Sequence, residues 1–268
     1  MSFVLEVFPL QDRLEDLKKL GDLIVQETLK YAKDTMEHLT IAFVAYICLC
    51  ITLYFVTAYL KFSPHYGHLP AVKRVLFVTA HPDDECMFFG PIILKLAQKN
   101  DCQLFLLCLS EGNYHKEGII RRKELWKSCE ILGIPDSNIT LCKSSFLPDD
   151  PSVRWREDIV ANVLLNHIEA LSIDTKLPPY CKAYALESIN TLRKYSAMLD
   201  IPISYLLSSF WYIISLRERS ILKTAMAAHQ SQYVWFRKLY MIFSRYTIVN
   251  TFKEIEIVDL ELDLELDD

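Results

Sequence analysis

Five consecutive residues, His81-Pro82-Asp83-Asp84-Glu85, place one imidazole and three carboxylates in a single short segment. Carboxylates that lose their water repel one another unless a cation lies between them, so the cluster is costly unless its charges are used. His81 and Asp84 are three residues apart across a turn that contains Pro82, and both side chains can face one divalent metal ion while Asp83 points to a bound water. The alternative is a helix start, with Asp83 or Asp84 as the N-cap and Glu85 interacting favourably with the helix dipole.

The segment that must position this cluster is the apolar run Val75–Ala80, which predicts a strand buried on both faces of a parallel sheet. A second buried strand, Gln103–Leu109, ends in Ser110-Glu111-Gly112-Asn113. Strands that alternate with helices predict an α/β fold, a Rossmann-like parallel sheet flanked by helices, whose sites lie at the carboxyl ends of the strands. The other predicted elements are helices over Met87–Gln98, Arg121–Leu132 and Asp158–Leu171 and a short strand over Ile139–Cys142.

The run Leu39–Leu60 has no charge over 22 residues. As a helix it is about 33 Å long, which matches a hydrocarbon core of about 30 Å, so it predicts an N-terminal transmembrane helix. The alternatives are a cleaved signal peptide and a buried core helix, but a signal peptide begins within the first few residues, whereas residues 1–38 precede this run and include four lysines. Those residues are predicted to form a weakly amphipathic helical lead-in. The numbers of basic residues before and after the apolar run Leu39–Leu60 are equal, so the positive-inside rule gives no membrane orientation.

A second uncharged run, Ile201–Leu216, has 16 residues and spans only about 24 Å as a helix. Pro202 interrupts it, so buried strands are predicted here rather than a second membrane span. The eight cysteines form no C-x-x-C pair and several lie in apolar runs, which favours reduced core thiols and a body that faces the cytosol.

The net charge of −5 is localised at the C-terminal end, where Lys253–Asp268 has one base and eight acids. We predict a disordered acidic tail for these residues. The rest of the chain is nearly balanced, and the absence of a basic excess argues against a nucleic-acid partner.

Several motifs carry a resemblance to a known family. They are Ala80 to Phe89, Ser110 to Tyr114, Gly118 to Leu125, Leu132 to Pro135, Pro148 to Pro151, Leu192 to Tyr195, and His229 to Gln232 with Trp235 to Arg237 and Ser244 to Tyr246. On these residues the chain resembles the LmbE-like zinc deacetylases from about Arg74 to Asn250. Within them it is similar to the branch that removes acetate from N-acetylglucosaminyl-phosphatidylinositol, the second step of GPI-anchor biosynthesis.

The resemblance implies roles for particular residues. His81 and Asp84 would be ligands of Zn²⁺ or another divalent metal, and Asp83 would be the general base. Arg121 would bind substrate phosphate or brace the active-site loops, although a salt bridge to Glu124 on its own helix is an equal alternative. His229 would lie near the mouth of the active site and contact substrate, unless it is a helix-surface histidine.

The resemblance also implies a location and partners. We expect a single-pass protein of the endoplasmic reticulum membrane whose catalytic domain faces the cytoplasm. Its partners would be the membrane and a phosphatidylinositol glycolipid substrate, without nucleic acid. The predicted organisation is a lead-in at 1–38, a transmembrane helix at 39–60, a deacetylase domain at 74–250 and an acidic tail at 253–268.

One part of the family pattern is missing from this sequence. Relatives supply a third zinc ligand from a Gly-His-x-Asn-His segment, but here Ser172–Thr175 runs directly into Lys176–Pro179, and His167 and His229 have no histidine between them. The domain is therefore internally shortened near 173–178. Because zinc hydrolases normally use three protein ligands, His81 and Asp84 alone should hold zinc weakly. The alternative to an active enzyme is a catalytically impaired membrane variant that retains a binding role.

Overall fold

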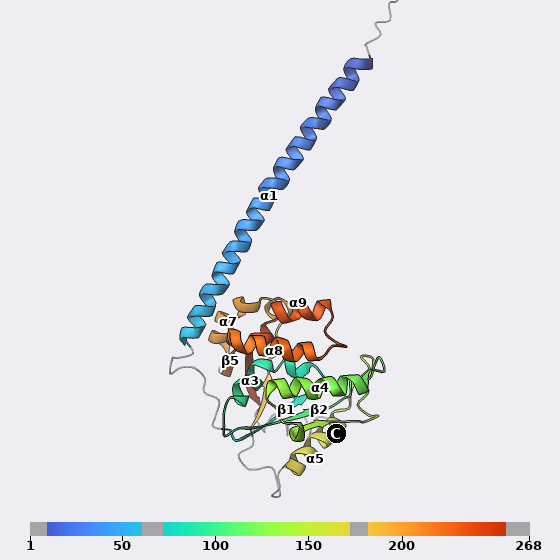
Figure 1. The fold of residues 1–268 in the computed structure, drawn as a ribbon, viewed down its shortest axis with the longest axis vertical. Helices are drawn as coiled ribbons and strands as arrows, with labels where there is room; N and C mark the ends of the chain where they lie inside the picture. The colour runs from blue at the N-terminus through green and yellow to red at the C-terminus, as the bar shows by residue number, and fades with distance from the viewer. Residues whose placement is uncertain (1–9, 61–71, 172–181, 209, 256–268) are drawn as a thin grey trace, which may run out of the picture. The chain divides into compact units, whose positions relative to one another are not determined.

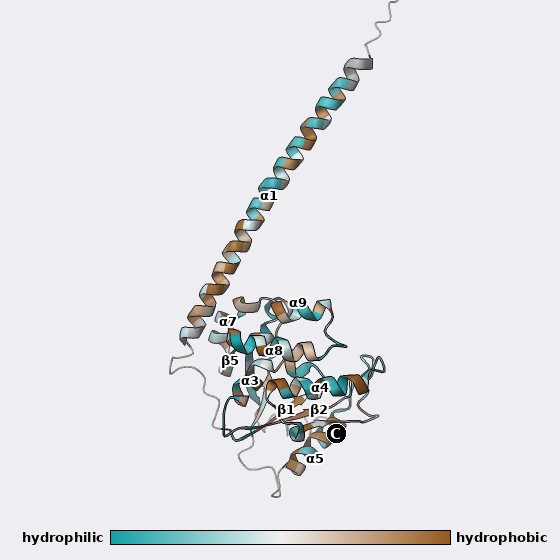
Figure 2. Cartoon of the chain, viewed as in Figure 1, coloured by the Kyte–Doolittle hydropathy of each residue, from teal (hydrophilic) through white to brown (hydrophobic). Residues whose placement is uncertain are grey.

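The computed structural model describes residues 10–60, 72–171, 182–208 and 210–255, and the chain divides into two units, Met1–Thr52 and Leu53–Asp268. Helix α1, Leu10–Leu60, is continuous over 51 residues, so the predicted lead-in and the apolar run belong to one helix. Figure 2 shows that its first half is mainly hydrophilic and its second half mainly hydrophobic. It contains one stretch long and apolar enough to cross a membrane, with a mean hydropathy of 1.8 and no buried residues.

The second unit is built on a parallel sheet of order β1-β2-β3, with strands Arg74–Thr79, Gln103–Cys108 and Ile139–Leu141. The central strand β2 is buried on both faces because its alternate residues enter different clusters. Leu104 and Leu106 pack on one side, and Leu107 packs on the other with residues of helix α5, Glu157–Leu171. The predicted α/β fold, a parallel sheet flanked by helices, is confirmed.

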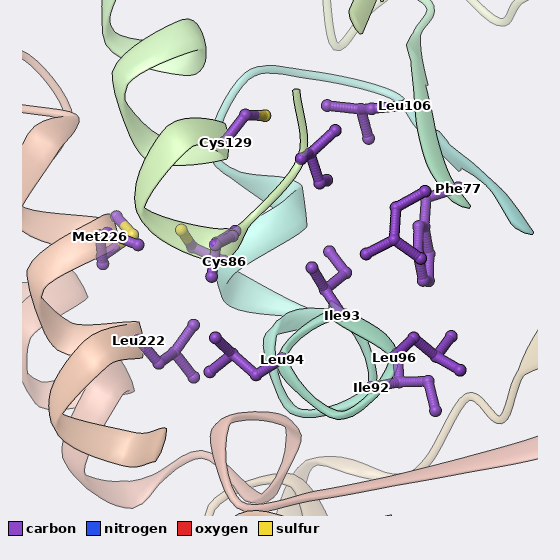
Figure 3. Close-up of a cluster of buried hydrophobic side chains, with 14 of the residues drawn as sticks. Phe77, Cys86, Ile92, Ile93, Leu94, Leu96, Leu106, Cys129, Leu222 and Met226 are labelled. Carbon is purple, nitrogen blue, oxygen red and sulfur yellow. The ribbon is translucent and has the colours of Figure 1, made fainter. Parts of the chain in front are cut away.

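The main core lies between this sheet and helices α3, Gly90–Ala97, α4, Gly118–Leu132, and α8, Leu216–Ala228. Figure 3 shows apolar side chains from these elements meeting around α3. Close packing of α3 on α8 requires a glycine at position 90, since a Cβ there would lie 2.2 Å from Leu222 Cδ1. Cys86 and Cys129 are free and belong to this core as small apolar groups.

A second sheet, which the sequence did not predict, is antiparallel with order β4-β6-β5. Its strands are Ala183–Leu186, Val249–Ile255 and Phe210–Ile213. The remaining elements are helices α2, Asp84–Met87, α6, Thr191–Lys194, α7, Ile201–Leu207, and α9, Trp235–Phe243, and 3₁₀ turns η1, Asp136–Asn138, η2, Ala197–Asp200, and η3, Arg245–Thr247.

Several predicted elements need correction. The run Ile201–Leu216 is not made of strands throughout, because α7 occupies its first part and only Phe210–Ile213 is a strand. Pro202 lies in the first turn of α7, where a missing N–H costs nothing, so it favours a helix start rather than breaking one. The helix predicted over Met87–Gln98 is α3 and begins only at Gly90, since Met87 is the last residue of α2. Helix α4 begins three residues earlier than predicted.

The predicted acidic tail also begins too early. Lys253–Ile255 belong to β6, where Glu254 forms an ion pair of 2.6 Å with Lys182 at the start of β4. Two residues of opposite charge across an antiparallel pair stabilise such an edge. The remaining tail residues, 256–268, and the predicted shortening near 173–178 lie outside the described residues.

Candidate active site

The loops that follow the three parallel strands meet at one edge of the first sheet. His81 comes from the loop after β1, and its Nε2 lies 3.0 Å from Oδ1 of Asp149, which follows β3. Its ring also packs against Trp155, with centroids 5.7 Å apart. The carboxyl ends of parallel strands converge in this way, so residues almost 70 positions apart become neighbours.

Asp83 is the most constrained residue of the cluster. Its backbone has φ 113°, a left-handed conformation that is rare outside glycine, and its N–H donates a hydrogen bond of 2.9 Å to Glu85 Oε2. Its carboxylate is buried, 3.0 Å from Arg237 Nη2 and 3.8 Å from Arg121 Nη2. Burial raises the pKa of Asp83 to about 7, although Arg237 opposes the shift. A carboxyl with a pKa near neutrality is suited to general base catalysis.

The helix-start alternative for this cluster is met in position but not in its capping bond, and Asp84 and Glu85 lie in the first turn of α2. Asp83 occupies the N-cap position of α2, but its side chain makes no capping hydrogen bond. Asp84 instead accepts hydrogen bonds from the N–H groups of Ala80 at 3.1 Å and His81 at 2.9 Å, which precede it. Burial raises the pKa of Asp84, opposed by these bonds and by His81. Asp84 therefore fixes the loop and keeps its carboxylate beside the imidazole.

Glu85 and His229 form a fully buried pair beneath this loop. His229 Nε2 lies 2.6 Å from Glu85 Oε1, and Ser128 Oγ donates to the same oxygen at 2.6 Å. Burial lowers the pKa of His229, but Glu85 outweighs it and the net shift is upward. Burial likewise raises the pKa of Glu85, but His229 and Ser128 outweigh it and the net shift is downward. Both shifts favour the charged forms of the pair, and the carboxylate of Glu85 also accepts the N–H of Asp83.

Arg121 braces the loops around the site. It donates to Pro82 O at 2.7 Å and to Gly112 O at 3.1 Å, and lies 3.5 Å from Asp149 Oδ2. A side chain at Gly112 would lie 2.4 Å from the guanidinium, and the positive φ of 66° also favours glycine there. The alternative salt bridge to Glu124 does not form, because Glu124 accepts hydrogen bonds from the backbone and hydroxyl groups of Ser231 at 2.8 and 2.6 Å.

A cavity of about 580 Å³ opens at this edge. Of the site residues predicted from the sequence, His81 and Arg121 line it, whereas Asp83, Asp84 and His229 do not. The cavity is also lined by four residues for which the sequence predicted no role, Asp149, Trp155, Gln232 and Arg237. The full lining is Ala80, His81, Tyr114, His115, Arg121, Pro148, Asp149, Asp150, Pro151, Val153, Trp155, Gln232 and Arg237.

Two donors, His81 on the cavity wall and Asp84 beside it, fit a divalent metal. His81 Nδ1 and Asp84 Oδ2 are 3.9 Å apart, and zinc bonds to nitrogen and oxygen of about 2.0 to 2.2 Å allow one ion to reach both. Asp149 lies against the opposite ring nitrogen, as carboxylates beside metal-binding histidines commonly do. Among the described residues, the one cluster with three donors is Glu85, Cys86 and His229. Its donors are engaged with one another and with Ser128, so it fits a structural network better than a metal site.

Comparisons with known proteins identify the family. An N-acetylglucosaminyl-phosphatidylinositol de-N-acetylase of Bos taurus is 45% identical over 209 residues, which cover 67% of this chain and 82% of that protein. The chain belongs to the GlcNAc-PI de-N-acetylase family. The sequence profile of that family, described as PIG-L: GlcNAc-PI de-N-acetylase, matches residues 76–183. The family predicted from the motifs is therefore confirmed.

More distant relatives share the same name. A probable N-acetylglucosaminyl-phosphatidylinositol de-N-acetylase of Dictyostelium discoideum is 31% identical over 243 residues, covering 69% of this chain and 94% of that protein. Among solved structures, an N,N'-diacetylchitobiose deacetylase from Pyrococcus horikoshii aligns with a TM-score of 0.43 and 18% identity, covering 69% of this chain and 84% of that one.

Proposed function

We propose that this chain removes the acetyl group from N-acetylglucosaminyl-phosphatidylinositol, giving glucosaminyl-phosphatidylinositol and acetate, the second step of GPI-anchor biosynthesis. One observation carries the proposal beyond the family. A buried carboxyl with a pKa of about 7, Asp83, adjoins the His81 and Asp84 donor pair and contacts Arg237, and His81 and Arg237 line a cavity of about 580 Å³. A base beside a metal site is what hydrolysis of an unactivated amide requires.

The proposed roles follow from the contacts. His81 and Asp84 would hold Zn²⁺ or another divalent ion, which when bound supplies a Lewis acid that polarises the acetyl carbonyl and acidifies water. Asp83 accepts the proton of the attacking water. As the C–N bond breaks, the same carboxyl can return a proton to the amine nitrogen, so acetate and a free amine leave. Arg237, at 3.0 Å, orients the carboxylate of Asp83 for this transfer.

We assign a bracing role to Arg121 and a supporting role to His229, and neither needs to touch the substrate. Arg121 donates to the loops after β1 and β2, and its position on the cavity wall still permits contact with a substrate phosphate. His229 acts through Glu85, whose second oxygen receives the N–H of Asp83.

We further propose that the metal is held weakly because a third protein ligand is missing. In support, Arg74 at the start of β1 donates a hydrogen bond of 2.6 Å to Leu171 O at the end of α5. Because the end of α5 lies beside the start of β1, the family strand expected after α5 would pair with β1. Among the described residues β1 is an edge strand of the first sheet, so no described strand takes that place. The next described strand, β4, belongs to the other sheet instead.

The apolar part of α1 is proposed to anchor the protein in the endoplasmic reticulum membrane as a single span, with the body facing the cytoplasm. Its length, hydropathy and exposure support a span. Carbonate extraction of membranes tests the anchor, and we expect full-length protein to stay in the pellet. Complete release into the supernatant would contradict it.

Acetate release from N-acetylglucosaminyl-phosphatidylinositol by the purified full chain tests the function. We expect release that a chelator stops and that added zinc restores. A chain with no release at saturating zinc would be the impaired variant with a binding role instead.

A further inference from the structure

Apolar side chains are exposed along one side of α9. Trp235, Leu239 and Ile242 are spaced by four and three residues, so they form a stripe on one face of the helix. Phe236 and Phe243 flank this stripe, and Trp235 is 72% exposed. The opposite side of α9 is already used, since Tyr240 and Met241 are buried in the main core. The outward stripe is therefore left largely exposed, with Leu239 and Ile242 each 45% exposed.

Helices α6 and α7 add further exposed apolar residues. Leu192 of α6 is 86% exposed, and Leu206 and Leu207 of α7 are 79% and 71% exposed. Helix α6 contacts α9 through the rings of Tyr195 and Tyr240, whose centroids are 6.3 Å apart. We call the exposed apolar residues of α6, α7 and α9 the docking face.

A buried ionic network holds α6 and α7 in place. Asp200 precedes α7 and accepts hydrogen bonds from Arg193 Nε of α6 at 2.6 Å and from Ser204 Oγ of α7 at 2.5 Å. Arg245 Nε lies 2.7 Å from the same carboxylate, and Arg245 also donates to Thr251 of β6 at 2.9 Å. Asp200, Ser204 and Arg245 have no exposed surface. The leucines are thus displayed on a fixed platform rather than on a loose loop.

The charges on the docking face have one sign. Arg193 and Arg237 pair with the buried carboxylates of Asp200 and Asp83, so the basic groups of the face are Lys194 of α6 and Lys238 of α9. None of the three helices contains an acidic residue. Aromatic and leucine side chains mixed with basic ones are typical of elements that lie in the interface of an anionic lipid bilayer. A protein partner would have to supply both an apolar surface and acidic groups.

The docking face is continuous with the cavity through α9. Arg237 lines the cavity and reaches Asp83 at 3.0 Å, while its guanidinium carbon lies 5.9 Å from the ring centre of Phe236. Two adjacent residues of α9 thus have different surroundings. Arg237 contacts the carboxylate of Asp83, and Phe236 belongs to the docking face. A lipid whose headgroup entered the cavity would have its acyl chains near such a surface.

We propose that the docking face binds the surface of a lipid bilayer, so that the body makes a membrane contact of its own in addition to α1. The inference rests on the proposed function in one respect, since a glycolipid substrate explains why such a face adjoins the cavity. The contact keeps the cavity at the depth of the headgroups, and the substrate need not leave the bilayer to be hydrolysed.

Tryptophan fluorescence can test this contact in the full chain. All four tryptophans, Trp126, Trp155, Trp211 and Trp235, lie after α1, so quenching by lipid reports on the body alone. The protein is reconstituted into vesicles of phosphatidylcholine and phosphatidylinositol, with either plain or brominated acyl chains. We expect brominated lipid to remove roughly a quarter of the emission, the share of one tryptophan in four.

Variants assign the signal. Trp235→Phe should emit equally in both kinds of vesicle, and Leu206→Ser with Leu207→Ser should weaken the quenching of the parent. Leu165→Ser is the matched control, because it is a 44% exposed leucine on α5 and should change nothing. Equal emission of the parent in both vesicles, or a loss that persists in Trp235→Phe, would overturn the proposal. Cross-linking of two chains through the face without quenching would assign it to a second copy instead. Quenching does not depend on catalysis. A chain that is quenched by brominated lipid but releases no acetate would therefore contradict the proposed function and leave the membrane contact standing.

Discussion

The two halves of the five-residue cluster are supported very differently. On the base half, Asp83 has its N–H bonded to Glu85, its carboxylate beside Arg237, and the buried Glu85 and His229 pair behind it. On the metal half, His81 and Asp84 present two donors 3.9 Å apart, and His81 is 33% exposed. The described residues support Asp83 from several sides and bring two donors, His81 and Asp84, to the proposed metal site.

This difference teaches that the shape of the loop and its metal binding are separable. The left-handed backbone of Asp83 is supported by contacts within the protein, from α4, from His229 at the end of α8 and from α9. A chain can therefore keep the fold of an active site while its affinity for the metal falls. Substitutions of Asp83 and of the residues that support it test the base half.

The largest effect is expected for Asp83→Asn. Removing the base should lower acetate release by about 10² to 10⁴-fold, since an amide cannot accept the proton. Metal content should not change, because His81 and Asp84 remain. Asp136→Asn, an exposed acid on η1, is the matched control and should retain the parent rate. A parent rate in Asp83→Asn would show that another group is the base.

His229→Ala should mainly affect stability. It leaves the charge of Glu85 buried without its partner, which costs about 3 to 5 kcal/mol, measured as the free energy of unfolding in urea. The double variant with Glu85→Gln should lose less than the sum of the two single changes. His167→Ala is the control, since this half-buried histidine of α5 has no ionic partner at its Nε2 and should lose about 1 kcal/mol or less. Equal losses for both histidines would mean that the ion pair does not matter.

A smaller effect is expected for Arg121→Lys. Lysine keeps the charge but cannot donate to Pro82 O and Gly112 O with one rigid fork, so the loops should loosen. We expect acetate release to fall about 10-fold, from the loss of one hydrogen bond made by a charged group. Arg122→Lys, its neighbour on the exposed side of α4, should behave like the parent. If the two variants had the same rate, Arg121 would not brace the site.

Much of this arrangement could be predicted from local patterns. The apolar run before His81 gave the strand, and alternation with helices gave the parallel sheet, because both signals are contained in short segments. The segments after β2 and β3 could be expected to contribute to the site, because sites in such sheets lie at the carboxyl ends of the strands. The resemblance added roles that no spacing could supply.

The rest depended on contacts between distant segments. His229 and Glu85 are 144 residues apart, and Arg237 gives no local signal that it will reach Asp83. Helix α4 buries Arg121, Glu124 and Ser128 on the side that faces the site, so its polar residues resemble a solvated face in the sequence. The second sheet was missed because its strands pair across 36 to 72 residues of sequence, so no local signal joins them.

The central claim is that the base half is complete and the metal half lacks a protein ligand. Acetate release is measured against free zinc for this chain and for one in which a Gly-His-x-Asn-His segment is inserted between Thr175 and Lys176. Loss of the hydrogen bonds that orient a metal ligand typically costs about 10 to 100-fold in affinity or activity, so this chain should need at least about 10-fold more zinc for half-maximal release. Asp83→Asn should abolish release in both. Equal rates of the two chains at limiting zinc would contradict the account.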